Sequence, residues 1–214
     1  MEFIDLEIER YIEDHTSGEN KLLERINRET NLEVMRPRML SGHVQGRLLS
    51  MFSKMISPQN ILEIGTYTGY SAICMAEGLK DEGKLTTIDV NEELEDRVRG
   101  YFAEAGLTNR VEFLIGDAME IIPLLDQQFD LVFIDADKSN YSNYLELVID
   151  KVPSGGYVIS DNVLWSGKVV EKFRKTLDKD TEALLKFNKD LHEDNRFENI
   201  LLGVRDGLMI LRKR

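Results

Sequence analysis

The sequence predicts an α/β fold, in which a mostly parallel sheet has helices on both faces. Short apolar runs typical of buried strands alternate with segments of helical spacing from residue 61 onwards. The chain then ends in two apolar runs, 197–204 and 208–211, joined by Arg205-Asp206-Gly207. An Asp-Gly pair between two strands is typical of a hairpin. We therefore expect a seven-stranded sheet with five parallel strands and a C-terminal antiparallel hairpin.

The segment before the sheet is expected to be helical. Apolar residues at helical spacing predict helices over 2–14 and 19–29, packed outside the sheet or against a partner subunit. Residues 30–42 are predicted to form a loop, and 44–56 a third helix. The apolar face of this third helix is expected to consist of Leu48, Leu49, Phe52, Met55 and Ile56. We interpret 1–57 as an N-terminal helical extension and 58–214 as the core of a single domain 1–214.

Strands and helices then alternate to the end of the chain. The predicted parallel strands are 61–64, 85–88, 111–115, 129–134 and 157–160. The predicted helices are 70–79, one capped by Asn91 that runs to about residue 105, 118–125, one that follows Lys138, and 179–194.

The composition bounds the class of protein. The chain has 214 residues, of which 42% are hydrophobic and 31% charged, as is ordinary for a globular domain. The single cysteine, Cys74, excludes an internal disulfide and is expected to be a small core residue. No apolar run approaches the ~20 residues of a membrane helix, and the acidic N-terminus does not resemble a signal peptide. These features predict a cytoplasmic protein.

The net charge disfavours general binding of nucleic acid. There are 27 basic and 39 acidic residues, which gives −12, and attraction to phosphate is weak for such a chain. Arg36 and Arg38, or the basic C-terminus over 212–214, could still form a local basic patch. A solvated surface is the simpler interpretation of both.

Acidic residues follow two neighbouring strands of the predicted sheet. Asp135 and Asp137 come after strand 129–134, and Asp161 and Asn162 come after strand 157–160. Open parallel sheets bind ligands at the carboxyl edge of their strands. Oxygens from Asp135, Asp161 and Asn162 suit a hard divalent cation, and the nearby Lys138 could act as a base. Helix capping explains any one of these residues, but the set favours a site.

The first predicted strand leads into a glycine-containing turn. Gly65 and Gly69 lie where the strand gives way to a helix, but their spacing is not that of G-x-G-x-x-G, and no P-loop lysine follows. This favours a nucleoside that carries no phosphate chain. Asp89 ends the second strand, where an acid can accept the ribose hydroxyls. Asp117 and Ala118 end the third and could line an adenine. Together these features predict an adenosine-type cofactor.

These motifs resemble those of one enzyme family. The stretches concerned are Glu63–Ser71, Ile88-Asp89, Gly116-Asp117-Ala118, Phe133–Lys138 and Asp161–Gly167. In this order they are similar to the cation-dependent O-methyltransferases of the caffeoyl-CoA/catechol type, which are class I S-adenosylmethionine (SAM) enzymes. The resemblance runs from about Met39 to the C-terminus. It implies a Rossmann-like class I methyltransferase fold and a homodimer.

The resemblance also implies roles for individual residues. SAM would be bound by Ser41, Glu63, Gly65, Thr66, Tyr67, Ser71, Asp89, Asp117, Ala118, Asp135 and Asp137. Asp135, Asp161 and Asn162 would hold the cation, which is usually magnesium, with manganese or calcium as alternatives. Lys138 would be the general base beside Asp135, and Tyr144 and Trp165 would border the acceptor. The family's Asp-Glu-Gly-Gln reads Val44-Gln45-Gly46-Arg47 here, which leaves one wall of the acceptor pocket undefined.

The sequence thus predicts a metal- and SAM-dependent O-methyltransferase that acts on a small catechol-like or hydroxycinnamoyl acceptor. One alternative is the same chemistry on a hydroxylated uridine of tRNA, which the charge of −12 disfavours. Another is a non-catalytic adenosine-binding module, which would need neither Lys138 nor the cation ligands. A nicotinamide dehydrogenase is the weakest alternative, because the glycine spacing is wrong.

Overall fold

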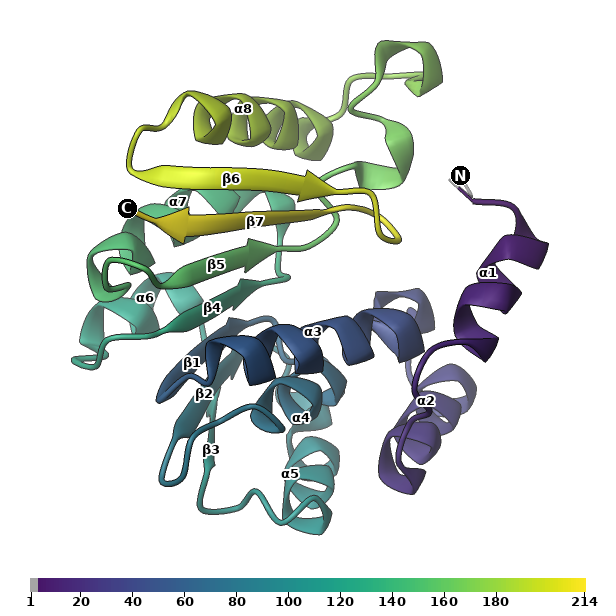
Figure 1. Cartoon of the computed structure of the whole chain (residues 1–214), viewed down its shortest axis with the longest axis vertical. Coiled ribbons are helices and arrows are strands. Elements are labelled where there is room, and N and C mark those ends of the chain that lie inside the picture. Colours follow the sequence, from purple (N-terminus) through teal and green to yellow (C-terminus); the bar gives the residue numbers. More distant parts are fainter. Residues whose placement is uncertain (1–3) are drawn as a thin grey trace.

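The sheet of the computed structural model, which describes residues 4–214, has seven strands in the order β3-β2-β1-β4-β5-β7-β6 (Figure 1). Their bounds are β1 Asn60–Ile64, β2 Lys84–Asp89, β3 Val111–Ile115, β4 Leu131–Ile134, β5 Tyr157–Ser160, β6 Phe197–Leu202 and β7 Leu208–Lys213. Strands β1 to β5 are parallel, and β7 pairs antiparallel with both β5 and β6. The predicted sheet with its C-terminal hairpin is confirmed.

The strand bounds agree with the sequence pattern to within one residue except at three ends. Strand β6 ends at Leu202 and not at Val204. Strand β4 begins at Leu131 and not at Phe129, because the Asp130 carboxylate accepts hydrogen bonds from the backbone N–H groups of Gln59 and Asn60. Strand β7 extends to Lys213, beyond the apolar run that marked it in the sequence. Pairing with strands on both sides holds this charged end of β7 in the sheet.

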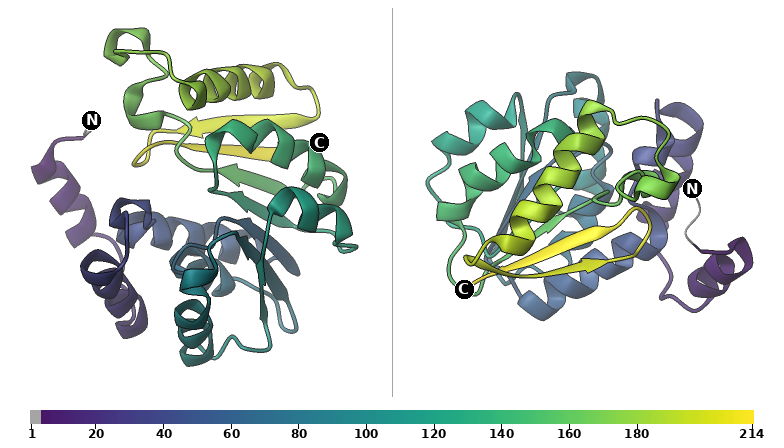
Figure 2. Two further views of the ribbon diagram at one scale, coloured as in Figure 1. Left: turned by 180° about the vertical axis from the view of Figure 1, so that it is seen from behind. Right: turned by 90° about the horizontal axis from the view of Figure 1, so that it is seen from above.

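The helices form a layer on each face of the sheet (Figure 2). They are α1 Leu6–Asp14, α2 Lys21–Glu33, α3 Gly42–Ile56, α4 Tyr70–Ala76, α5 Glu95–Glu104, α6 Ala118–Ile121, α7 Tyr141–Val148 and α8 Lys179–Glu193. Side chains of β4 alternate between the two layers, as the pleat of a strand requires. Val132 and Ile134 pack with α6, α7 and α8, whereas Leu131 and Phe133 pack with α2, α3, α4 and α5.

The predicted apolar face of α3 is confirmed except at Met55, because Leu48, Leu49, Phe52 and Ile56 pack in the core. The prediction missed that the helix also buries small and polar side chains. The side chains that α3 buries are mostly small or polar, namely Gln45, Gly46, Leu49, Ser50 and Ser53. Met55 is 75% exposed. The reason is that α3 packs closely on α4, so that small side chains face inward. Gly78, just after α4, lies so near α3 that a Cβ there would be 2.2 Å from the backbone carbon of Ser53.

The two N-terminal helices differ in how they attach. Helix α2 buries Leu23, Ile26 and Thr30, and it continues to Glu33 into the segment predicted as a loop. The rest of that segment contains a 3₁₀ turn over Pro37–Met39. Helix α1 buries none of its residues and lies apart from the sheet (Figure 1). Within residues 4–214, no helix is both long and apolar enough to cross a membrane.

We predict that Gly78→Ala destabilises the protein by about 1–3 kcal/mol, the usual cost of overpacking. The added methyl group would clash with the backbone of α3 at Ser53 and Lys54. Gly100→Ala is the matched control, because Gly100 lies exposed on α5 with open space around its Cβ position. It should stabilise by about 0.5–1 kcal/mol through helix propensity. Urea unfolding measures both, and equal effects would contradict close packing of α3 on α4.

Candidate active site

The acidic residues predicted at the strand ends do meet at one edge of the sheet. Ile134, the last residue of β4, pairs in register with Ser160, the last residue of β5. The residues that follow them, Asp135 and Asp161, are therefore neighbours, and the backbone N–H of Asp161 donates to Ile134 at 3.0 Å. Asn162 adopts a left-handed backbone with φ of 58° directly after them.

Asp161 is buried at this edge and is held at both carboxylate oxygens. Its side chain is 3% exposed. Oδ1 accepts the backbone N–H of Asn162, and Oδ2 accepts the side-chain amide of Gln45 on α3, each at 2.6 Å. Burial and the negative charge of Asp135 raise the pKa of Asp161. Because two acids repel each other here, a cation between them would relieve an unfavourable charge.

Lys138 lies buried beside these acids. Its Nζ is 3.0 Å from Asp135 Oδ1 and 2.5 Å from the hydroxyl oxygen of Tyr141. Tyr141 in turn donates to the backbone carbonyl of Asp161 at 2.9 Å, and burial raises its pKa well above its ordinary value. An ammonium has three N–H groups, so Lys138 keeps one for a further partner.

Tyr141 is a site residue that the sequence analysis missed. The signal that could have identified it is its position three residues after Lys138, since residues at this spacing share a helix face.

The glycine turn after β1 touches the acidic edge directly. A Cβ at Gly65 would lie 2.0 Å from the backbone oxygen of Asp135, so only glycine allows this approach. Gly69 also has a positive φ, 75°, where the turn enters α4. The predicted cofactor turn and the predicted cation ligands are thus parts of one site.

Glu63 lies fully buried beneath the glycine turn. Its carboxylate accepts the hydroxyl groups of Ser71 and Thr87, each at 2.5 Å. Thr66, from the turn itself, is hydrogen-bonded to Thr87. Burial raises the pKa of Glu63 to about 8. This network joins β1, the turn, α4 and β2, and it holds three predicted cofactor residues together.

Other predicted cofactor residues surround the same turn. Asp89 accepts the backbone N–H of Tyr67 at 2.7 Å and that of Asn91 at 2.9 Å. Asp117 caps α6 through the N–H of Met119, and Ala118 beside it is buried. Asp117 therefore caps a helix, whereas Asp89 binds backbone N–H groups of the glycine turn and of the loop after β2. Neither contact prevents a cofactor role, because a carboxylate accepts several hydrogen bonds.

The remaining predicted residues lie around the edge. Ser41 is buried at the start of α3. Asp137 is exposed and accepts the hydroxyl of Tyr144, whose ring is buried in the core. Trp165 packs against that core and has a left-handed backbone, with φ of 49°. Whether Tyr144 and Trp165 border an acceptor stays a prediction.

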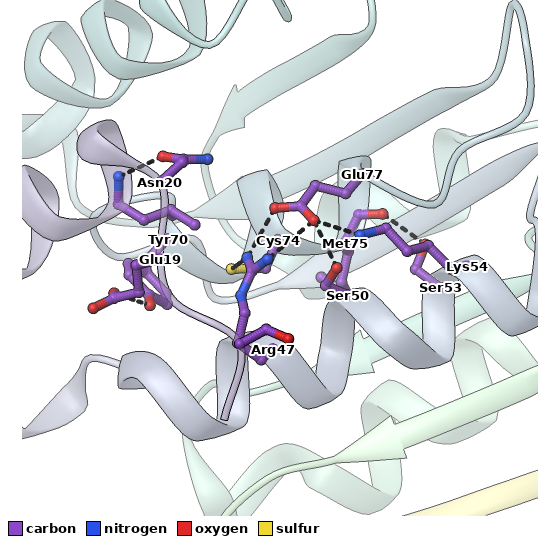
Figure 3. Close-up of polar contacts among 12 residues, drawn as sticks. Glu19, Asn20, Arg47, Ser50, Ser53, Lys54, Tyr70, Cys74, Met75 and Glu77 are labelled. Atoms are coloured by element: carbon purple, nitrogen blue, oxygen red, sulfur yellow. Dashed lines mark hydrogen bonds and ion pairs between the residues drawn. The ribbon is translucent and has the colours of Figure 1, made fainter. Parts of the chain in front are cut away.

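A polar cluster on the other side of α3 fixes this helix on α4 (Figure 3). Glu77 accepts hydrogen bonds from Arg47, Ser50 and Lys54, which lower its pKa to about 2. The buried Cys74, a core residue as predicted, accepts Arg47 at 3.3 Å. Arg47 thus faces away from the acidic edge, and of the Val44–Arg47 stretch it is Gln45 that contacts the edge.

The described residues contain no group of three or more His, Cys, Asp or Glu side chains that could hold a metal. The predicted cation set instead joins two acids with the amide of Asn162. A hollow lined by Phe52, Met55 and Pro153 lies near the starts of β4 and β5, at the opposite edge of the sheet from the predicted site.

Comparison with known proteins identifies close relatives. The profile of the O-methyltransferase family matches residues 13–214. A caffeoyl-CoA O-methyltransferase from Nicotiana tabacum is 38% identical over 188 residues, which cover 82% of this chain and 77% of that one. An SAH-bound methyltransferase from Podospora anserina is 28% identical with a TM-score of 0.89, covering 97% of this chain and 94% of that one. The O-methyltransferase TomG from Streptomyces achromogenes, in complex with SAM, is 27% identical with a TM-score of 0.86, covering 97% and 96%.

We predict that the stability gap between Glu63→Gln and the wild type depends on pH. The folded pKa of Glu63 is about 8, above its ordinary value of 4.5. Between these values the unfolded chain has released a proton that the folded protein retains. The wild type should therefore lose stability as pH rises through this window, by at most about 1.4 kcal/mol per pH unit.

Urea unfolding of the ligand-free protein from pH 5 to 8.5 measures this effect. The stability of Glu63→Gln relative to the wild type should increase steadily with pH. The control is Glu112→Gln on the exposed face of β3. Its unfolding free energy, plotted against pH, should run parallel to that of the wild type. Parallel curves for Glu63→Gln as well would show that Glu63 is already ionised in the folded protein.

Proposed function

The chain belongs to the O-methyltransferase family, and on this premise we propose that its acceptor is a small molecule with two adjacent hydroxyl groups, held by a divalent cation. It is a SAM-dependent O-methyltransferase, in line with its relatives and with solved neighbours that hold SAM or SAH. The observation that supports the proposal best is the pair of neighbouring acids, the partly exposed Asp135 and the buried Asp161, beside the buried Lys138.

The donor set at the acidic edge fits a hard cation such as magnesium. Asp135 and Asp161 supply carboxylate oxygens and Asn162 an amide oxygen, which are the ligands that such cations prefer. A bound cation would supply charge stabilisation for a deprotonated acceptor hydroxyl. Manganese and calcium have the same preference for oxygen, and the identity of the ion is a matter for measurement.

The chain's own residues would orient the two reactants. The turn over 65–71 and Asp89 would hold SAM, with Glu63 fixing Ser71 and Thr87 beneath it. Ser41, Asp117, Ala118 and Asp137 would complete the SAM site. Because Gly65 brings this turn against Asp135, the methyl donor and the acceptor would lie side by side. Holding them in line is much of the catalysis.

In its neutral form the Lys138 amine would accept the acceptor's proton, with Tyr141 and Asp135 keeping it in place. Trp165 and Tyr144 would flank an aromatic acceptor. A catechol or a hydroxycinnamoyl compound fits these requirements, and the name of the tobacco relative supports the second. Transfer to a hydroxylated uridine of tRNA would use the same chemistry.

The proposal is tested by methyl transfer from labelled SAM to caffeic acid, with magnesium and with a chelator. Transfer that requires the cation is expected. Absence of transfer, with SAM binding verified by calorimetry, would exclude the catechol acceptor, and the same assay on hypomodified tRNA would then test the RNA alternative. Transfer that persists in the chelator would remove the cation from the proposal.

We predict that Asp161→Ala abolishes methyl transfer but leaves the affinity for SAM unchanged, because Asp161 would hold the acceptor side only. Asp150→Ala is the control, since Asp150 is an exposed acid remote from this edge. Activity is measured with saturating magnesium and SAM affinity by calorimetry. Full activity of Asp161→Ala would refute its assignment as a cation ligand.

We predict that Lys138→Ala lowers turnover by a factor on the order of 10²–10⁴, the usual contribution of a general base. Lys151→Ala is the control, because Lys151 binds only the backbone oxygen of Leu125. Single-turnover transfer at saturating acceptor measures both variants. If Lys138→Ala matches the wild type at every pH, the acceptor is activated without this lysine.

We also infer a homodimer that covers helix α1. Ile8 and Tyr11, three residues apart on one face of α1, are 54% and 63% exposed, and apolar side chains gathered on one helix face are normally covered. Light scattering at micromolar concentration should give the dimer mass, and Ile8→Glu with Tyr11→Glu should give the monomer. A monomeric wild type would contradict this inference.

Two further points complete the proposal. We place the protein in the cytoplasm, because its single cysteine is buried and unpaired among the residues described. We also propose that 1–214 is a single domain, in which 1–57 is an N-terminal helical extension and 58–214 the core.

A further inference from the structure

The side chain of Gln45 is fully buried where helix α3 meets the acidic edge of the sheet. Its exposed fraction is 0%, and its Nε2 lies 2.6 Å from Asp161 Oδ2. The two residues are 116 positions apart in the chain. An amide at this depth within hydrogen-bond distance of a carboxyl needs a physical reason, because burying polar groups costs free energy unless each is paired.

The orientation of this amide follows from its partner. A carboxylate oxygen only accepts hydrogen bonds, so the nitrogen of Gln45 faces Asp161. The amide oxygen is then fixed as an acceptor, and because it shares a carbon with Nε2 it also lies beside the carboxylate. Oε1 is buried and has no hydrogen-bond partner among residues 4–214. A buried acceptor of this kind is expected to meet a donor in the working protein.

The hydrogen bonds that chain donors make at this edge go to other atoms. The backbone N–H of Asn162 donates to Asp161 Oδ1, and the Lys138 amine donates to Asp135 and Tyr141. Because no donor of residues 4–214 reaches Oε1, this oxygen is open to a donor from a bound molecule. At a site that receives hydroxyl groups, the chemistry that matches a lone amide oxygen is an acceptor O–H.

We propose that Gln45 is a positioning residue of the acceptor site, whose amide nitrogen orients the Asp161 carboxylate and whose amide oxygen accepts a hydrogen bond from a hydroxyl group of the methyl acceptor. This inference rests on the proposed function, since it requires the acceptor to bind beside Asp161. It also gives the site a means of selection: an acceptor with a methyl ether in place of that hydroxyl has no proton to donate and leaves Oε1 unpaired.

The first test measures the orientation of Asp161 without catalysis. Mn²⁺ is titrated calorimetrically into the full-length protein with SAH present. Gln45→Met, which keeps the size of the side chain but removes the amide, should weaken Mn²⁺ binding by about 10–100-fold, as for other groups that orient a metal ligand. Ser53→Ala is the matched control, because it removes a buried hydrogen bond of the same helix, to Met75. It should leave Mn²⁺ affinity unchanged, and both variants should bind SAH as the wild type does.

The second test measures the hydroxyl contact. At saturating metal, the KM for caffeic acid should rise by about 2–10-fold in Gln45→Met, the usual effect of one lost hydrogen bond. Unchanged SAH binding by Gln45→Met guards against a variant that simply fails to fold.

The outcomes separate this inference from the proposed function. If the wild type does not methylate catechols, the proposed function fails, while the Mn²⁺ titration still reports on Gln45 and Asp161. If the wild type is active but Gln45→Met has unchanged Mn²⁺ affinity and KM, the inference is overturned. Weakened Mn²⁺ binding by Gln45→Met together with an unchanged KM overturns the hydroxyl contact, and Oε1 is then satisfied by a buried water.

Discussion

Burial of the Asp161 carboxyl is the constraint on which the rest of the site depends. A buried charge is tolerated only with compensation at each oxygen, and the chain supplies it from two directions. The backbone of Asn162 turns into the left-handed region and donates to one oxygen, while Gln45 reaches across from α3 to the other. Strand β5, the loop after it and α3 are therefore fixed together by one side chain.

The position of α3 matters because it sets where the Gln45 amide meets Asp161. On its far side the same helix is tied to α4 by the cluster around Glu77, where Arg47, Ser50 and Lys54 converge. Part of this cluster is exposed, so each ion pair adds little by itself, but together they define how α3 sits on α4. Small side chains on the inner face of α3 permit the close approach, and Gly78 permits it from the side of α4.

Much of the fold was predictable because its strands are short, apolar and ended by acids. The apolar runs predicted both ends of β3 and of β5 correctly. The acids that follow β4 and β5 lie next to each other, as expected. The small and polar side chains that α3 buries were not predictable, because the close approach of α4 places them and not hydrophobicity. Gln45 and Tyr141 were missed for a related reason: their roles depend on contacts with Asp161 and Lys138 that only the folded chain creates.

The stretch Val44–Arg47, which departs from the family's pattern, directs its side chains to two different sides of helix α3. Residues two apart on a helix point in different directions, so Gln45 reaches the acidic edge while Arg47 reaches Glu77. A neutral amide at the edge adds no negative charge beside Asp135 and Asp161, and it still donates to the buried carboxylate. On the other side of α3, the positive charge of Arg47 offsets the negative charge of Glu77. Because both contacts belong to one rigid helix, a change in the Glu77 cluster would shift Gln45, and an apparently structural ion cluster would then influence how the acceptor is held.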